Sequence, residues 1–90
     1  MKVEISPRVV RDLEDIADRI ARHNPRRATT YVQEIRSKAL GLANSPHIGA
    51  PRHGNYLIVY RVRETVQILR VVHGARDLDE LFAREPLPED

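Results

Sequence analysis

The 90-residue chain contains no cysteine, which excludes disulfide bonds, thiolate nucleophiles and zinc sites built on cysteine. No apolar run approaches the ~20 residues that a membrane-spanning helix requires. Residues 1–7 contain no apolar signal-peptide stretch. These absences predict a cytoplasmic protein with no membrane partner, and a chain of this length is expected to form one domain with a modest core.

Motifs for metal, cofactor or nucleophilic chemistry are also missing. The histidines do not have metal-ligand spacing, no serine has the Gly-x-Ser-x-Gly setting of an activated nucleophile, and the glycines are too dispersed for a phosphate-binding loop. We therefore expect no metal site and no cofactor. The residues considered are His23, His47, His53, His73, Ser6, Ser37, Ser45, Gly41, Gly49, Gly54 and Gly74.

Charge is distributed unevenly along the chain. Residues 1–76 contain 14 basic and 7 acidic residues, a net charge of +7, whereas residues 77–90 have a net charge of −5. Thirteen of the fifteen basic residues are arginine, whose forked guanidinium matches carboxylate and phosphate groups. A basic body predicts an acidic partner, either nucleic acid or an acidic polypeptide. The alternative is that these arginines simply lie on solvent-exposed helix faces and bind no partner.

Hydrophobic periodicity predicts an α+β fold. Alternation over residues 3–5 indicates a short strand, and apolar residues spaced by three and four predict helices over residues 7–22 and 25–43. Residues 56–62 and 66–72 are rich in β-branched and aromatic residues and predict a hairpin of two strands.

The predicted architecture is a two-layer sandwich in the order β-α-α-β-β. An N-terminal strand precedes an antiparallel helical hairpin, which packs on a small antiparallel β-sheet. We expect a single domain over residues 1–84 and a flexible acidic tail over residues 85–90.

The most unusual segment covers residues 70–78, where a strand ends at His73 and Gly74 permits a sharp bend. If Arg61 and Arg70 share a sheet face, they form with His73 a surface that binds phosphate or carboxylate. The alternative for Arg70 is a structural pair with a local acid such as Asp77.

Several motifs together resemble the ParE branch of the RelE/ParE toxin superfamily. They include Ser6-Pro7, Asn24-Pro25, the segment 45–52, and Tyr60-Arg61-Val62 followed by residues 68–77, Ile-Leu-Arg-Val-Val-His-Gly-Ala-Arg-Asp. The resemblance extends from about residue 3 to residue 78. It implies a toxin of a type II toxin–antitoxin pair with a β-α-α-β-β-β fold. It also implies neutralisation by a cognate antitoxin and inhibition of DNA gyrase in a bacterial cell.

The chain departs from the family pattern in two respects. Only His53 separates Arg52 from Gly54, where family members have several more residues, so the strand at this position is expected to be very short or absent. Phe82 and Leu57 stand where the nuclease branch of the superfamily has polar or basic groups. Because RNA cleavage needs general acid–base groups, we expect a non-catalytic inhibitor that acts by binding.

The predicted sites follow from this interpretation. Target binding is assigned to the end of the last strand, and antitoxin binding to apolar and aromatic positions of the helical hairpin. The alternative function is a RelE-like ribosome-dependent mRNA endoribonuclease, and direct sequence-specific nucleic-acid binding is not expected because the second helix lacks a dense polar face. The residues are Arg70, His73, Arg76 and Asp77 for the target; Ile16, Ile20, Tyr31 and Ile35 for the antitoxin; and Arg61, Arg70, His73 and Arg76 for the alternative nuclease.

Overall fold

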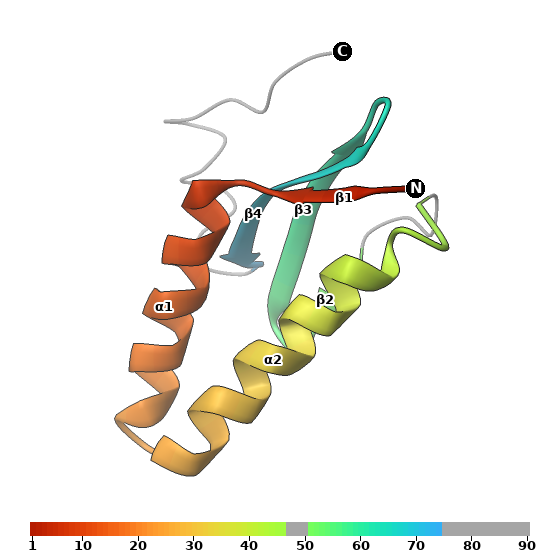
Figure 1. Cartoon of the computed structure of the whole chain (residues 1–90). Helices are drawn as coiled ribbons and strands as arrows, with labels where there is room; N and C mark the ends of the chain where they lie inside the picture. The colour runs from red at the N-terminus through yellow and green to blue at the C-terminus, as the bar shows by residue number, and fades with distance from the viewer. Residues whose placement is uncertain (47–50, 75–90) are drawn as a thin grey trace.

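The computed structural model describes residues 1–46 and 51–74. These residues form a helical layer on a four-stranded sheet of order β1-β4-β3-β2 (Figure 1), which confirms the predicted α+β class. The elements are β1 (Val3–Ile5), α1 (Pro7–Ala21), α2 (Pro25–Gly41), β2 (Arg52–His53), β3 (Tyr56–Val62) and β4 (Val66–His73).

Some predictions lie outside the described residues. They concern the target-binding residues Arg76 and Asp77, the substituted position Phe82, and the tail at residues 85–90 with the domain boundary before it.

The sheet is mixed. β3 is antiparallel to both of its neighbours, as expected for the predicted hairpin, but β1 runs parallel to β4. Parallel neighbours require a crossover connection, and the helical hairpin together with β2 and β3 provides it. The predicted antiparallel sheet is therefore extended by one parallel strand.

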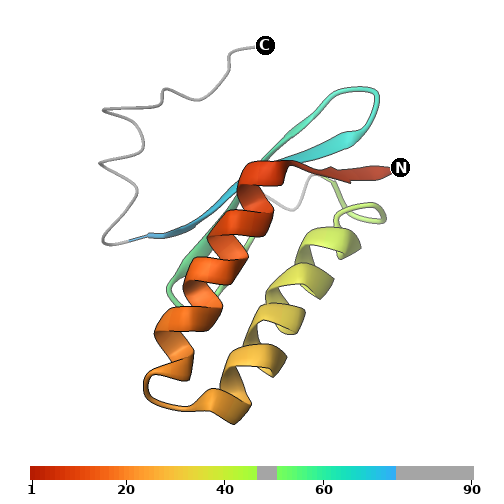
Figure 2. The same ribbon diagram turned by 60° about the vertical axis from the view of Figure 1, so that its left-hand side comes forward.

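Each helix begins at the predicted cap. The Ser6 side chain accepts a hydrogen bond from the backbone N–H of Val9, and the Asn24 side chain accepts one from that of Arg27, at 3.3 and 3.1 Å. A proline follows each cap, where its missing N–H costs nothing. The two helices lie side by side over one face of the sheet (Figure 2).

The core lies between the helical hairpin and this face of the sheet. The buried face of α1 contains Asp12 between Val9 and Ile16, so a carboxylate interrupts the apolar stripe. The apolar members of the core are Val9, Ile16, Ile35, Ala39, Leu42, Tyr56, Ile58, Val66, Ile68 and Val71.

A β-bulge changes which residues of β4 face the core. Val59 pairs with Arg70 and Tyr60 pairs with Ile68, so Leu69 is the extra residue of β4. Before the bulge the buried residues alternate, at Val66 and Ile68, whereas after it the adjacent Val71 and Val72 are both buried, at 3% and 1% exposed. The side chain of Arg70, which directly follows the bulge, is 15% exposed.

The strand β2 has only two residues, which confirms the expectation of a very short strand. Arg52 pairs with Leu57 and His53 with Tyr56. Gly54 follows with φ +58°, a left-handed conformation that favours glycine. The shortened segment is therefore closed by a tight glycine turn.

Candidate functional site

The residues predicted to bind the target are divided by the structure. Arg70 and His73 lie in the last four residues of β4, whereas Arg76 and Asp77 are beyond the described residues. Arg61, from the alternative nuclease site, lies on β3. The described part of the predicted target site is therefore the carboxyl end of β4.

Arg70 is anchored to the first helix. Its Nε donates to Oδ2 of Asp12 at 2.9 Å, and its Nη2 donates to Oδ1 at 3.2 Å. The side chains are 15% and 6% exposed, so this forked ion pair is largely shielded from water. The sequence offered a local acid such as Asp77 as a structural partner of Arg70, and Asp77 lies outside the described residues. Within those residues Arg70 binds Asp12, 58 residues earlier.

Asp12 has further partners. Its Oδ2 also accepts the backbone N–H of Val71 at 3.0 Å, and Arg8 Nε lies 3.9 Å from Oδ1. A buried carboxylate requires hydrogen bonds and opposite charge to offset its lost hydration, and Asp12 receives both. The group joins α1 to the end of β4.

Arg61 and Arg70 have different described partners. Arg61 Nε donates to the amide oxygen of Gln67 at 2.5 Å, and the register places Gln67 between Glu4 of β1 and Arg61 of β3. The structure therefore joins Arg61 to Gln67 and Arg70 to Asp12, with no contact between the two guanidinium groups among the described interactions.

A polar hollow of about 660 Å³ lies beside this row. Both acidic and basic side chains line it, so it has no single sign of charge. The lining residues are Glu4, Arg61, Arg63, Glu64, Thr65 and Gln67.

Four aromatic rings connect the end of β4 with the second helix. The rings of His73 and Tyr56 meet edge to face at 5.4 Å between centroids, Tyr56 and Tyr31 at 6.2 Å, and Tyr31 and His53 at 4.7 Å. Such edge-to-face pairs are favourable beyond their buried area. His73 therefore lies at one end of a packed aromatic row.

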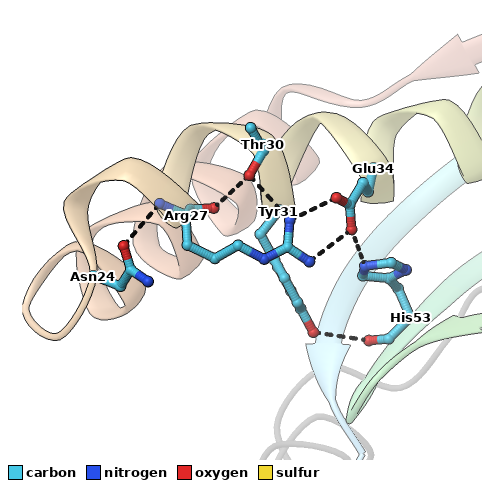
Figure 3. Close-up of polar contacts among 6 residues, drawn as sticks. All are labelled: Asn24, Arg27, Thr30, Tyr31, Glu34 and His53. Atoms are coloured by element: carbon cyan, nitrogen blue, oxygen red, sulfur yellow. Dashed lines mark hydrogen bonds and ion pairs between the residues drawn. The ribbon is translucent and has the colours of Figure 1, made fainter.

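Sequence reasoning did not find the polar cluster at the other end of this row (Figure 3). Glu34 accepts two hydrogen bonds from Arg27, at 2.6 and 3.0 Å, and one from Nε2 of His53 at 2.8 Å. Tyr31 donates its hydroxyl to the His53 carbonyl at 3.3 Å. The cluster fastens the short β2 to α2.

Electrostatics in this cluster favour an ionised carboxylate. The hydrogen bonds from Arg27, followed by its charge and by His53, lower the pKa of Glu34 to about 2. An ionised carboxylate only accepts hydrogen bonds, so Nε2 of His53 carries the proton in their contact. The hydrogen bonds that Arg27 donates to Glu34 raise the pKa of the Arg27 guanidinium.

One signal of this cluster was present in the sequence. Arg27, Tyr31 and Glu34 are spaced by four and three and share a helix face. Their partner His53 follows 19 residues after Glu34, in a segment without periodicity. Its placement depends on tertiary structure, which pattern reasoning does not supply.

The four predicted antitoxin-binding residues lie at different depths. Ile35 is 0% exposed and Ile16 is 6% exposed, so both belong to the core, whereas Ile20 and Tyr31 are only partly buried. Ile20 and Tyr31 are therefore the members of the set with surface available to a partner. The antitoxin-binding role of the set stays a prediction.

A groove of about 390 Å³ offers a more accessible apolar surface on the hairpin. Val10, which lines this groove, is 49% exposed. Single exposed apolar side chains are common, but a patch of them indicates a binding surface. The groove forms such a patch, because apolar residues line it and polar residues form its rim. The lining residues are Ile5, Val10, Leu13, Glu14, Ala17, Val32, Gln33 and Arg36.

Residues 1–46 and 51–74 contain neither a metal-binding cluster nor a membrane-spanning helix. No group of three or more His, Cys, Asp or Glu in these ranges is arranged to hold a metal ion. Their helices are also too short or too polar to cross a membrane.

Comparison with models of known protein families identifies a family for this chain. A family model described as the ParE toxin of the type II toxin–antitoxin system parDE matches residues 3–78. A search of curated proteins finds no match. The matched range contains every described helix and strand.

Proposed function

The chain belongs to the ParE toxin family of type II toxin–antitoxin systems, and from this premise we propose that it arrests bacterial growth by binding DNA gyrase in the cytoplasm. A cognate antitoxin neutralises it. The target surface is the carboxyl end of β4, with Arg70, His73, Arg76 and Asp77. The observation that carries this proposal is the family match over residues 3–78.

The structure supports a partner on the helical hairpin. The groove combines an apolar wall, in which Val10 is half exposed, with the cation Arg36 on its rim. The body around it has a net charge of +7 over residues 1–76. An antitoxin segment with apolar anchors and acidic residues complements both properties.

The arrangement of the end of β4 favours binding over catalysis. The guanidinium of Arg70 donates hydrogen bonds to Asp12, and the ring of His73 packs against Tyr56. General acid–base catalysis requires a group free to transfer a proton in the substrate complex. A non-catalytic inhibitor therefore accounts for these residues with fewer rearrangements than a nuclease does.

The experiment measures gyrase supercoiling with the purified protein, alone and with the antitoxin encoded by the neighbouring reading frame. We expect dose-dependent inhibition that a stoichiometric amount of antitoxin reverses. In parallel, mRNA ends are mapped in a translation reaction with ribosomes. Unchanged supercoiling together with codon-specific mRNA cuts would overturn the proposal in favour of the RelE-like nuclease.

A further inference from the structure

β4 is longer than β1, the strand that pairs with its outer edge. β1 pairs with β4 only from Val66 to Ile68, whereas β4 continues to His73. Ser6 provides the next contacts, since its backbone N–H donates to the Ile68 carbonyl and its hydroxyl to the Leu69 carbonyl, at 3.2 and 3.3 Å. Beyond Leu69, the edge faces α1.

Asp12 takes the place of a strand neighbour on this part of the edge. Its carboxylate accepts the N–H of Val71, a backbone donor that would otherwise be buried with Val71, which is 3% exposed. Buried backbone donors require a partner. A carboxylate supplies it without a further β-strand.

Arg70 allows the Asp12 carboxylate to take the place of a neighbouring strand. Arg70 directly follows the bulge at Leu69, and its guanidinium binds both oxygens of Asp12. The charge of the carboxylate is thereby compensated in a site that is only 6% exposed. The bulge, the arginine and the helical acid form one unit.

We propose that Asp12 is a positioning residue for target binding. By fixing Val71 and Arg70, it sets the direction in which β4 ends, and hence the location of His73. The inference rests on the proposed function for the role of that surface. The positioning itself is a property of the fold, and it is measured separately.

The test compares Asp12→Asn with Asp15→Asn. Asparagine keeps an oxygen acceptor but removes the charge that Arg70 binds, and Asp15 is an exposed acid on the same helix. Two NMR readouts are used: the hydrogen exchange rate of the Val71 amide and the imidazole resonances of His73, which the Tyr56 ring shifts. Both are measured under conditions where all variants are folded.

For Asp12→Asn we expect exchange at Val71 to become at least about tenfold faster, the fold-change that corresponds to one weakened charged hydrogen bond. The His73 resonances should move, and growth inhibition at matched soluble protein levels should be lost. Asp15→Asn should match the wild type in all three measurements.

A lower melting temperature with unchanged His73 resonances and unchanged growth inhibition would overturn the positioning role. If Asp12→Asn does not fold, Arg70→Lys replaces it in the NMR measurements, because it keeps the positive charge but loses the forked contact. It should accelerate Val71 exchange and move the His73 resonances, and the absence of both effects would overturn the proposal. A wild-type protein that leaves gyrase unaffected would contradict the proposed function, while the two NMR readouts would still decide the positioning role.

Discussion

The hydroxyl oxygen of Tyr31 lies 2.5 Å from the place that a Cβ atom on residue 54 would occupy. Gly54 is the turn residue after β2, and Tyr31 belongs to α2. The close approach explains how a strand of two residues is held: the turn is left-handed, and the tyrosine of the helix fills the space that a side chain would take. Tyr31 then donates to the neighbouring carbonyl of His53.

Gly54→Ala is therefore expected to destabilise the protein. The left-handed backbone costs an alanine about 1 kcal/mol, and the contact with Tyr31 adds to it, so we expect a loss of about 1–3 kcal/mol in the free energy of unfolding. Chemical denaturation measures it. The matched control is Gly41→Ala at the end of α2, where a Cβ meets nothing within 4 Å.

The control Gly41→Ala should change the free energy of unfolding in the opposite direction. Alanine is preferred over glycine in a helix, so Gly41→Ala should stabilise the protein by about 0.5–1 kcal/mol. Equal effects at the two positions would contradict the account of the Tyr31 contact.

The Glu34 cluster predicts a specific acid sensitivity. The pKa of Glu34 is lowered to about 2 in the folded protein, chiefly by hydrogen bonds from Arg27, against 4.5 as its ordinary value. A lowered folded pKa contributes stability that is present above the ordinary value and is lost as the pH falls toward 2. Thermal unfolding between pH 7 and pH 2 should show this loss.

Glu34→Gln should flatten this part of the pH profile, because the glutamine has no proton to take up. The side chain of Glu34 is 41% exposed, so the effect is moderated by water and salt. Glu14→Gln, which changes an exposed glutamate of α1, is the control and should retain the acid-dependent loss. An unchanged slope for Glu34→Gln would show that other carboxylates determine it.

The groove on the helical hairpin is tested with Val10→Asp. Because Val10 is 49% exposed, the change should leave the melting temperature nearly unaltered. It places a charge in the apolar contact with the antitoxin, so affinity should fall at least about tenfold. Calorimetric titration with the antitoxin measures the loss.

Leu40→Asp is the matched control, because Leu40 is 44% exposed on α2 but does not line the groove. It should leave antitoxin affinity near the wild-type value. If Leu40→Asp weakened binding and Val10→Asp did not, the antitoxin would lie on another face of the hairpin.

The local elements could be predicted from the sequence because their signals are local. Ser6 and Asn24 are strong caps, each followed by a proline, and the strands around Ile58 and Ile68 are rich in β-branched residues. The order of elements follows from these signals, and the short β2 followed from the missing residues between Arg52 and Gly54.

The candidate site depends on pairings that no local pattern contains. Arg70 binds an acid 58 residues away, and it directly follows a bulge at Leu69 that interrupts the regular pairing of β4 with β3. Bulges depend on register, and register depends on how the strands pack. Asp12 lies on a helix rich in acids, so its burial could not be distinguished from the exposure of Asp15 by sequence alone.

Arg70 and Arg76 provide the last prediction, since both were assigned to the target surface. Arg70→Ala should lower the free energy of unfolding by about 3 kcal/mol, because it leaves Asp12 charged and buried without its main partner. For Arg76 the sequence places the side chain just after the bend at Gly74, where we expect it to face solvent. Arg76→Ala should therefore leave the melting temperature nearly unchanged and weaken growth inhibition. Thermal unfolding and growth inhibition are measured side by side for both variants. A large loss of stability in Arg76→Ala with inhibition intact would assign Arg76 a structural role, and the target surface would then have to be sought elsewhere on the chain.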